Sequence, residues 1–189
     1  MKKVFVLALL AMTVCLTGCK EAHVTPINQI AKLCFAPGGN DSKWDYMDLR
    51  ASGDDREFSV SVSDYQEYEN ACEEKKVTSE AISYKLGGAQ CTVYSNSCAE
   101  DNTAYVKVAI PHNDPLCLTC DANGNFNCKA YEFLENYNVL DKNYAKVHHF
   151  TVELASNVID YYFAEGVGLI YAQDIQGKVC LKLISSTIY

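Results

Sequence analysis

The sequence lacks the short motifs that identify the common enzyme classes. It contains no G-x-S-x-G nucleophile elbow, no H-E-x-x-H zinc motif, no phosphate-binding loop and no dinucleotide-binding G-x-G-x-x-G. Acidic pairs occur at Asp54-Asp55 and Glu73-Glu74, where they are typical of solvated turns or helix faces. Paired carboxylates for hydrolysis can lie far apart in a sequence, so an envelope hydrolase is kept as a third hypothesis. We expect no catalytic residue, no metal and no cofactor.

Long apolar runs are also missing. The longest, Val4–Leu16 (VFVLALLAMTVCL), is shorter than the roughly 20 residues that a membrane-spanning helix needs. Lys2 and Lys3 precede it, and Gly18 and Cys19 follow it without a stop-transfer cluster. A short apolar run behind a positive start is typical of a secretory signal peptide. The sequence therefore predicts export, with residues 1–18 as the signal.

The end of this signal carries a second pattern, Leu16-Thr17-Gly18-Cys19. These four residues resemble the lipobox of bacterial lipoproteins. The resemblance implies that Cys19 is linked to a diacylglycerol, becomes the first residue after cleavage and anchors the chain. Lys20 rather than Asp follows the cysteine, which in such proteins implies the outer membrane, facing the periplasm or the exterior. Two or more acyl chains hold a protein stably on a bilayer.

Length and charge narrow the remaining choices. Cleavage of residues 1–18 from the 189-residue chain leaves 171 residues, the size of a single domain with a substantial core. Loss of Lys2 and Lys3 takes the formal net charge from −8 to −10. A strongly acidic chain repels phosphate backbones, so we expect no nucleic-acid partner. We divide the mature chain into a lipidated tether, residues 19–33, and a single β-rich domain, residues 34–189.

Cysteine is abundant, with ten residues in the full chain. Cys15 leaves with the signal and Cys19 takes the lipid, so eight remain, an even number that predicts four disulfides in an exported protein. Spacing favours a Cys91–Cys98 bridge and a bridge from Cys117 or Cys120 to Cys128, but the sequence does not choose among the pairings. The candidates are Cys34, Cys72, Cys91, Cys98, Cys117, Cys120, Cys128 and Cys180.

Strand patterns dominate the rest of the chain. Alternating or β-branched stretches cover residues 58–63, 103–110, 145–154, 158–163, 168–172 and 178–184. A short helix is expected in Asn28–Leu33, another could cover Tyr65–Lys76, and Asn136–Lys142 is turn-like. The predicted fold is mainly β: an antiparallel curved sheet, half-barrel or sandwich with one or two short helices, cross-linked by disulfides.

The C-terminal segment carries a second resemblance, in Ile159–Leu183. An aromatic strand (Tyr161, Tyr162, Phe163), a G-x-G turn at Gly166 and Gly168, and two further strands resemble a hairpin common in bacterial lipoproteins and periplasmic proteins. Many such proteins have curved sheets or half-barrels similar to lipoprotein carriers. The resemblance implies β architecture and leaves function open. By themselves, the two glycines indicate a bend or bulge in the backbone.

Some small groups of residues suggest redox or metal chemistry, but each also has a plain structural explanation. Cys117-Leu118-Thr119-Cys120 is a C-x-x-C, yet turn-forming residues follow it where a redox pair needs a helix, so we expect structural disulfides. A zinc site of Cys117, Cys120, Cys128 and Cys180 is the less favoured alternative. Asp121, Asn123 and Asn125 resemble the start of a calcium loop, but Asn123-Gly124 is better explained as a type I′ hairpin turn.

The histidine pair His148-His149 lies on an expected strand. Neighbouring residues of a strand point to opposite faces, so the two cannot easily bind one metal.

Taken together, these patterns favour a non-catalytic lipoprotein of the bacterial cell envelope with a binding or scaffold role. Its expected partners are the membrane, through the N-terminal lipid, and a protein or another envelope component. The alternative is a carrier of lipids or other apolar ligands that holds them in a half-barrel cavity.

Overall fold

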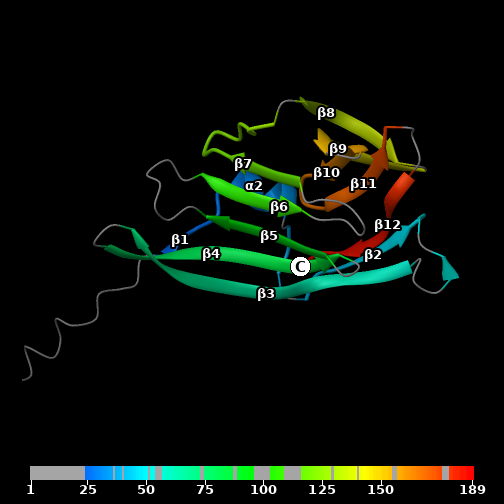
Figure 1. Ribbon diagram of the computed structural model, residues 1–189. Helices are drawn as coiled ribbons and strands as arrows, with labels where there is room; N and C mark the ends of the chain where they lie inside the picture. The colour runs from blue at the N-terminus through cyan, green and yellow to red at the C-terminus, as the bar shows by residue number, and fades with distance from the viewer. Residues whose placement is uncertain are drawn as a thin grey trace, which may run out of the picture.

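The structure of the chain is a computed structural model (Figure 1). It describes residues 24–35, 37–39, 41–50, 52–53, 57–72, 75–86, 89–95, 103–108, 116–128, 130–139, 141–154, 157–175 and 179–189. Within these ranges the elements are one helix and twelve strands. In chain order they are β1 (Val24–Thr25), α2 (Gln29–Phe35), β2 (Lys43–Asp48), β3 (Glu57–Cys72), β4 (Lys75–Leu86), β5 (Ala89–Ser95), β6 (Ala104–Val108), β7 (Leu116–Cys120), β8 (Ala130–Val139), β9 (Lys142–Leu154), β10 (Asn157–Ala164), β11 (Gly168–Asp174) and β12 (Val179–Thr187).

The strands form a continuous antiparallel order, β7-β6-β5-β4-β3-β2-β12-β11-β10-β9-β8. The long strand β3 joins two halves, because its first residues pair with β2 and its later residues pair with β4. A register shift between Val62 and Asp64 marks the change of partner, and such irregularities bend a strand. The short strand β1 lies parallel to β4, beside Thr78 and Ser79.

Helix α2 lies inside the curve of the sheet and touches both halves (Figure 1). Its contacts are with β5 and β6 on one side and with β10 and β11 on the other. Ala31, Cys34 and Phe35 on its inner side are fully buried. The Phe35 ring packs against Phe163 and Phe150, with centroids 4.7 and 5.8 Å away. The inner faces of both halves therefore share one core that is built around the helix.

The expected fold class is confirmed: the protein is mainly β, with a curved antiparallel sheet and one short helix in the described part of the chain. The short helix expected at Asn28–Leu33 is found as α2. The second helix, expected over residues 65–76, is wrong, because most of that stretch pairs as β3 and β4 in an antiparallel hairpin. Its few apolar positions fit a strand as well as a helix, so pairing with neighbouring strands decides the structure.

The packed body begins before residue 34. Ile27 and Asn28, which the sequence analysis places in the tether, are only 4% and 5% exposed. The Asn28 Oδ1 atom accepts a hydrogen bond from the Ala31 backbone N–H at 2.8 Å. This is the N-cap interaction that satisfies a free donor at the start of a helix, and it fixes where α2 begins.

The glycine pair of the C-terminal hairpin forms the tight turn between β10 and β11. Gly166 and Gly168 have φ values of 72° and 90°, a region that residues with side chains rarely adopt. The turn brings the Gly166 N–H within 2.9 Å of the Leu33 carbonyl, so it caps the end of α2. Trp44 on β2 donates its ring N–H to the Val167 carbonyl at 2.7 Å. The G-x-G bend therefore ties the hairpin to both the helix and β2.

The position of Phe35 predicts a large loss of stability on truncation. We expect Phe35→Ala to lower the free energy of unfolding by about 3–5 kcal/mol, because it leaves a cavity between the two halves of the sheet. Leu33→Ala, on the exposed side of the same helix, should cost less than about 1 kcal/mol. Urea unfolding of both variants measures the difference, and equal losses would contradict the central role of the helix.

Candidate functional site

The predicted lipid attachment site lies outside the described residues. This holds for Cys19 and for the lipobox residues Leu16, Thr17 and Gly18. In the part of the chain that is described, no helix is long and apolar enough to cross a membrane. The lipid anchor thus stays a prediction from the sequence.

The structure places four of the eight predicted disulfide cysteines in full. Cys34, Cys117, Cys120 and Cys128 are present as thiols. The backbones of Cys72, Cys91 and Cys180 lie on β3, β5 and β12, while their side chains, and the whole of Cys98, are outside what is described. The predicted bridges to Cys128 and between Cys91 and Cys98 stay predictions.

Both cysteines of the C-x-x-C lie on strand β7, but their side chains point to opposite faces of the sheet. Residues three apart in a strand point to opposite faces, and Cys117 is exposed whereas Cys120 is fully buried. The two thiols cannot act as one redox pair in this conformation. Cys117 and Cys120 likewise cannot both ligate one zinc ion in this conformation, and no group of three potential metal ligands occurs among the described residues, which leave out the Cys180 side chain.

The loop after β7 is a hairpin turn, as the sequence analysis favoured. An isolated antiparallel bridge pairs Cys120 with Phe126, and Gly124 has a φ of 84°. The expected type I′ geometry is wrong, because it requires a positive φ at Asn123 as well, which the structure does not have. The Asp121 carboxylate is already used within the loop, where it accepts hydrogen bonds from the backbone N–H groups of Asn123 and Asn125 at 2.8 and 2.9 Å.

The two histidines of β9 point to opposite faces, as predicted, and each meets a carboxylate. His149 Nε2 lies 3.1 Å from Asp160 Oδ1, and its ring stacks on Tyr162 with centroids 4.3 Å apart. Tyr162 in turn stacks on Tyr137 at 4.5 Å. Burial and the hydrogen bond with Tyr137 raise the pKa of Tyr162 far above its usual value, so its hydroxyl stays protonated. This outer cluster is a set of satisfied structural contacts.

His148, on the inner face, belongs to a chain of polar residues that no local sequence pattern predicts. Its Nδ1 lies 3.1 Å from the Tyr131 hydroxyl and its Nε2 lies 3.3 Å from Glu165 Oε1. Lys146 reaches the other oxygen of Glu165 at 3.3 Å. The partners come from β8, β9 and the turn after β10, and only the strand register brings them together.

The electrostatics of the Glu165–His148–Tyr131 chain do not favour nucleophilic catalysis. A carboxylate that orients a histidine beside a hydroxyl is the arrangement of an activated nucleophile. Here burial, and then the nearby Cys34, Cys120 and Glu165, raise the pKa of the Tyr131 hydroxyl, so it is harder to deprotonate. Burial also lowers the pKa of His148. We interpret the Glu165–His148–Tyr131 chain as a structural network that holds strand β8 in place.

Strand β8 ends the strand order and has one ladder partner, β9, among the described strands. It carries two large exposed side chains, Tyr131 at 39% and Phe133 at 42% exposure. The rings of both pack against His148 on their inner side. The structure thus presents an aromatic edge, defined as Tyr131 and Phe133 on β8. An exposed strand edge is a surface to which an extended segment of another chain can bind.

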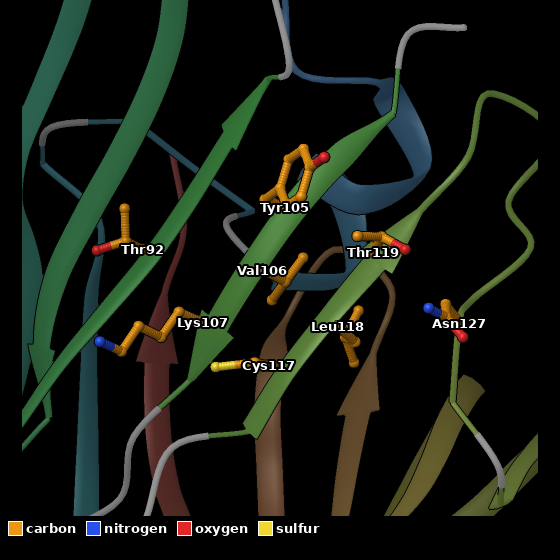
Figure 2. A pocket seen from close by; sticks show the side chains of 8 residues that line it. All are labelled: Thr92, Tyr105, Val106, Lys107, Cys117, Leu118, Thr119 and Asn127. Carbon is orange, nitrogen blue, oxygen red and sulfur yellow. The ribbon is translucent and has the colours of Figure 1, made fainter. Parts of the chain in front are cut away.

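Two hollows lie close to the other end of the strand order. One, of about 410 Å³, opens on the outer face of β5–β7 between Thr92, Lys107 and Cys117 (Figure 2). The other, of about 330 Å³, lies between β7 and the β8–β9 pair and is lined by Cys117, Cys128 and Glu153 among others. The two ends of the sheet therefore face each other across the second hollow.

Comparison with known proteins gives no further guidance. No family model matches the chain, and no curated protein or solved structure is significantly similar to it.

The buried position of His148 predicts its titration. Because burial outweighs the opposing effect of Glu165, NMR titration should give His148 a pKa below the ordinary 6.5. Glu165→Gln should lower that pKa further, since it removes the partner of the charged ring. Just below pH 6.5, the unfolded chain binds a proton at this histidine that the folded chain does not bind. The free energy of unfolding therefore falls as the pH falls below about 6.5. A pKa at or above 6.5 would contradict this account.

Proposed function

We propose that this protein is a non-catalytic lipoprotein of the bacterial cell envelope, which displays a β-rich domain on a lipid anchor and binds a partner there. The pattern Leu16-Thr17-Gly18-Cys19 behind a short apolar signal is the observation that carries this proposal. The first packed elements support it. Strand β1 begins at Val24, five residues after Cys19, so the lipid would lie close to the folded body.

The inner face of the sheet supports a binding or scaffold role over a carrier role. A carrier of apolar ligands needs an open interior of several hundred Å³. Inside this curve, α2 and the rings of Phe35, Phe150 and Phe163 are in mutual contact and fully buried. The hollows described above lie at the ends of the sheet rather than inside the core. The carrier alternative therefore has less support than display and binding.

The hydrolase alternative has one specific feature, the Glu165–His148–Tyr131 chain. The raised pKa of Tyr131 opposes its use as a nucleophile. Truncation at His148 would also disturb the aromatic packing of Phe126 and Phe133, so loss of an activity in such a variant would not by itself assign catalysis.

The aromatic edge on β8 is the surface that fits partner binding best. Tyr and Phe side chains give large contact areas, and the side of β8 that has no ladder partner among the described strands offers backbone groups for a strand of the partner. The exposed Glu132 and Glu135 on the same strand carry negative charge, which favours a partner segment that includes basic residues.

The lipid anchor is tested directly at Cys19. We expect the protein, expressed with its own signal in a Gram-negative host, to incorporate an alkyne-labelled fatty acid and to partition into the detergent phase of a cloud-point extraction. Cys19→Ser should lose both properties, whereas Cys15→Ser, which changes a cysteine within the signal, should keep both. Equal labelling of the Cys19→Ser chain would contradict lipidation at this residue.

Partner binding at the aromatic edge is tested by photo-cross-linking in the envelope. A photoreactive phenylalanine analogue at position 133 should give a discrete adduct of higher mass, because the Phe133 side chain is 42% exposed on β8, the last strand of the order. The same analogue at position 175, where Ile175 is 68% exposed in the turn after β11, is the matched control. No adduct from position 133, or the same adducts from both positions, would contradict a binding role for this edge.

A further inference from the structure

The fully placed cysteines fall into two groups with different surroundings. Cys34 and Cys120 are fully buried and lie where α2 meets the end of β7, while Cys117 and Cys128 line the hollow between the two ends of the sheet. We propose that Cys34 and Cys120 form a disulfide in the exported protein, which joins α2 covalently to β7. The pairing goes beyond the bridges expected from spacing, since 86 positions separate the two residues in the sequence.

The side chain of Asn28 places Cys120 beside the first turn of the helix. Asn28 Nδ2 donates to the Cys120 carbonyl at 2.8 Å, and the Cys120 thiol donates to Asn28 Oδ1 at 3.8 Å. The same Oδ1 atom accepts the Ala31 N–H at 2.8 Å. Cys34 follows Ala31 by three residues, so the two occupy one face of the helix, and both are fully buried.

A second contact brings the same two segments together. Phe126, the bridge partner of Cys120, packs edge-on against Phe35, the neighbour of Cys34, with centroids 5.9 Å apart. The two thiols also sense each other electrostatically. Burial and then the charge of Cys120 raise the pKa of Cys34, and burial raises the pKa of Cys120 to about 11. Both thiols are therefore buried, and burial disfavours the thiolate at each of them.

Because both thiols are buried in the folded protein, the Cys34–Cys120 bond must form before folding is complete. The reactive species in disulfide formation is the thiolate, and folding suppresses it at both residues. Oxidation therefore precedes complete docking of α2. One thiolate attacks the disulfide of an exported oxidant, breaks its S–S bond and forms a mixed disulfide, and the second thiolate then breaks the mixed disulfide and releases the oxidant. The protein loses two protons and two electrons, and the oxidant leaves as a dithiol.

The remaining placed cysteines are consistent with this pairing. If Cys120 bonds to Cys34, Cys128 is left for Cys117, and these two line the same hollow. Of the two bridges to Cys128 that the spacing allows, the proposal thus selects the one from Cys117. It depends on export to an oxidising compartment but not on the lipid, so failure of lipidation at Cys19 would leave it intact.

Peptide mapping of the full chain, purified from the envelope without reductant and alkylated, tests the pairing. Combined cleavage after Lys and before Asp places Cys34 in residues 33–40, Cys117 with Cys120 in residues 114–120, and Cys128 in residues 121–129. We expect all three fragments to be linked in the unmodified protein. In Cys117→Ser, residues 33–40 should stay linked to residues 114–120, while Cys128 becomes free for alkylation. Protein retained in the reducing cytoplasm should show none of these links.

Two results would overturn the proposal. One is recovery of residues 33–40 from the unmodified exported protein in the alkylated form, or linked to a fragment other than 114–120. The other is persistence of the 33–40 to 114–120 link in Cys120→Ser. Mapping of the unmodified protein and of Cys117→Ser, whose changed side chain is exposed, does not depend on whether the Cys120 variant folds.

Discussion

Helix α2 must contact both halves of the sheet at once, and the rest of the structure depends on this constraint. Seven residues are too few for a helix that is stable in isolation. Three tertiary contacts hold it instead. Asn28 caps its start, Phe35 packs into the aromatic core, and the turn at Gly166 caps its end. Because β3 is the one described strand that pairs with both halves, the helix and β3 together keep the two halves facing each other.

The inner face of β9 and β10 carries both the aromatic core and the buried His148. On the inner face, Phe150, Tyr161 and Phe163 build the core, and His148 is the polar residue among them that needs partners. Tyr131 and Glu165 supply those partners, and by doing so they fix the orientation of the β8 edge. The aromatic edge is therefore held in place by the Glu165–His148–Tyr131 chain, in which His148 is the buried member.

Local patterns in the sequence predicted the strands well, because alternation and turn residues act over a few positions. The C-terminal strands and the bend at Gly166 and Gly168 were found in this way. The helix predicted for residues 65–76 is wrong because the polar residues of this stretch carry no clear period, and its strand form depends on pairing between β3 and β4. The Glu165–His148–Tyr131 chain and the approach of Cys34 to Cys120 depend on long-range register, which one sequence does not reveal. The opposite holds for the lipobox, because the sequence pattern predicts it but its residues lie outside the described structure.

The predicted lipid anchor, the helix and the proposed disulfide would form one path for mechanical force. With a lipid on Cys19, the five residue steps to Val24 span at most about 18 Å, since an extended chain advances about 3.6 Å per residue. Any pull between membrane and domain therefore reaches β1 and then α2 almost directly. β1 has only two paired residues, so it can resist little force. α2 has no ladder hydrogen bonds to the sheet and depends on side-chain packing and two caps. A covalent bond from Cys34 to β7 would transfer this load to a five-residue strand paired along its length with β6. Since the helix is the element that holds both halves of the sheet together, the bond lies where loss of the helix would cost the fold most.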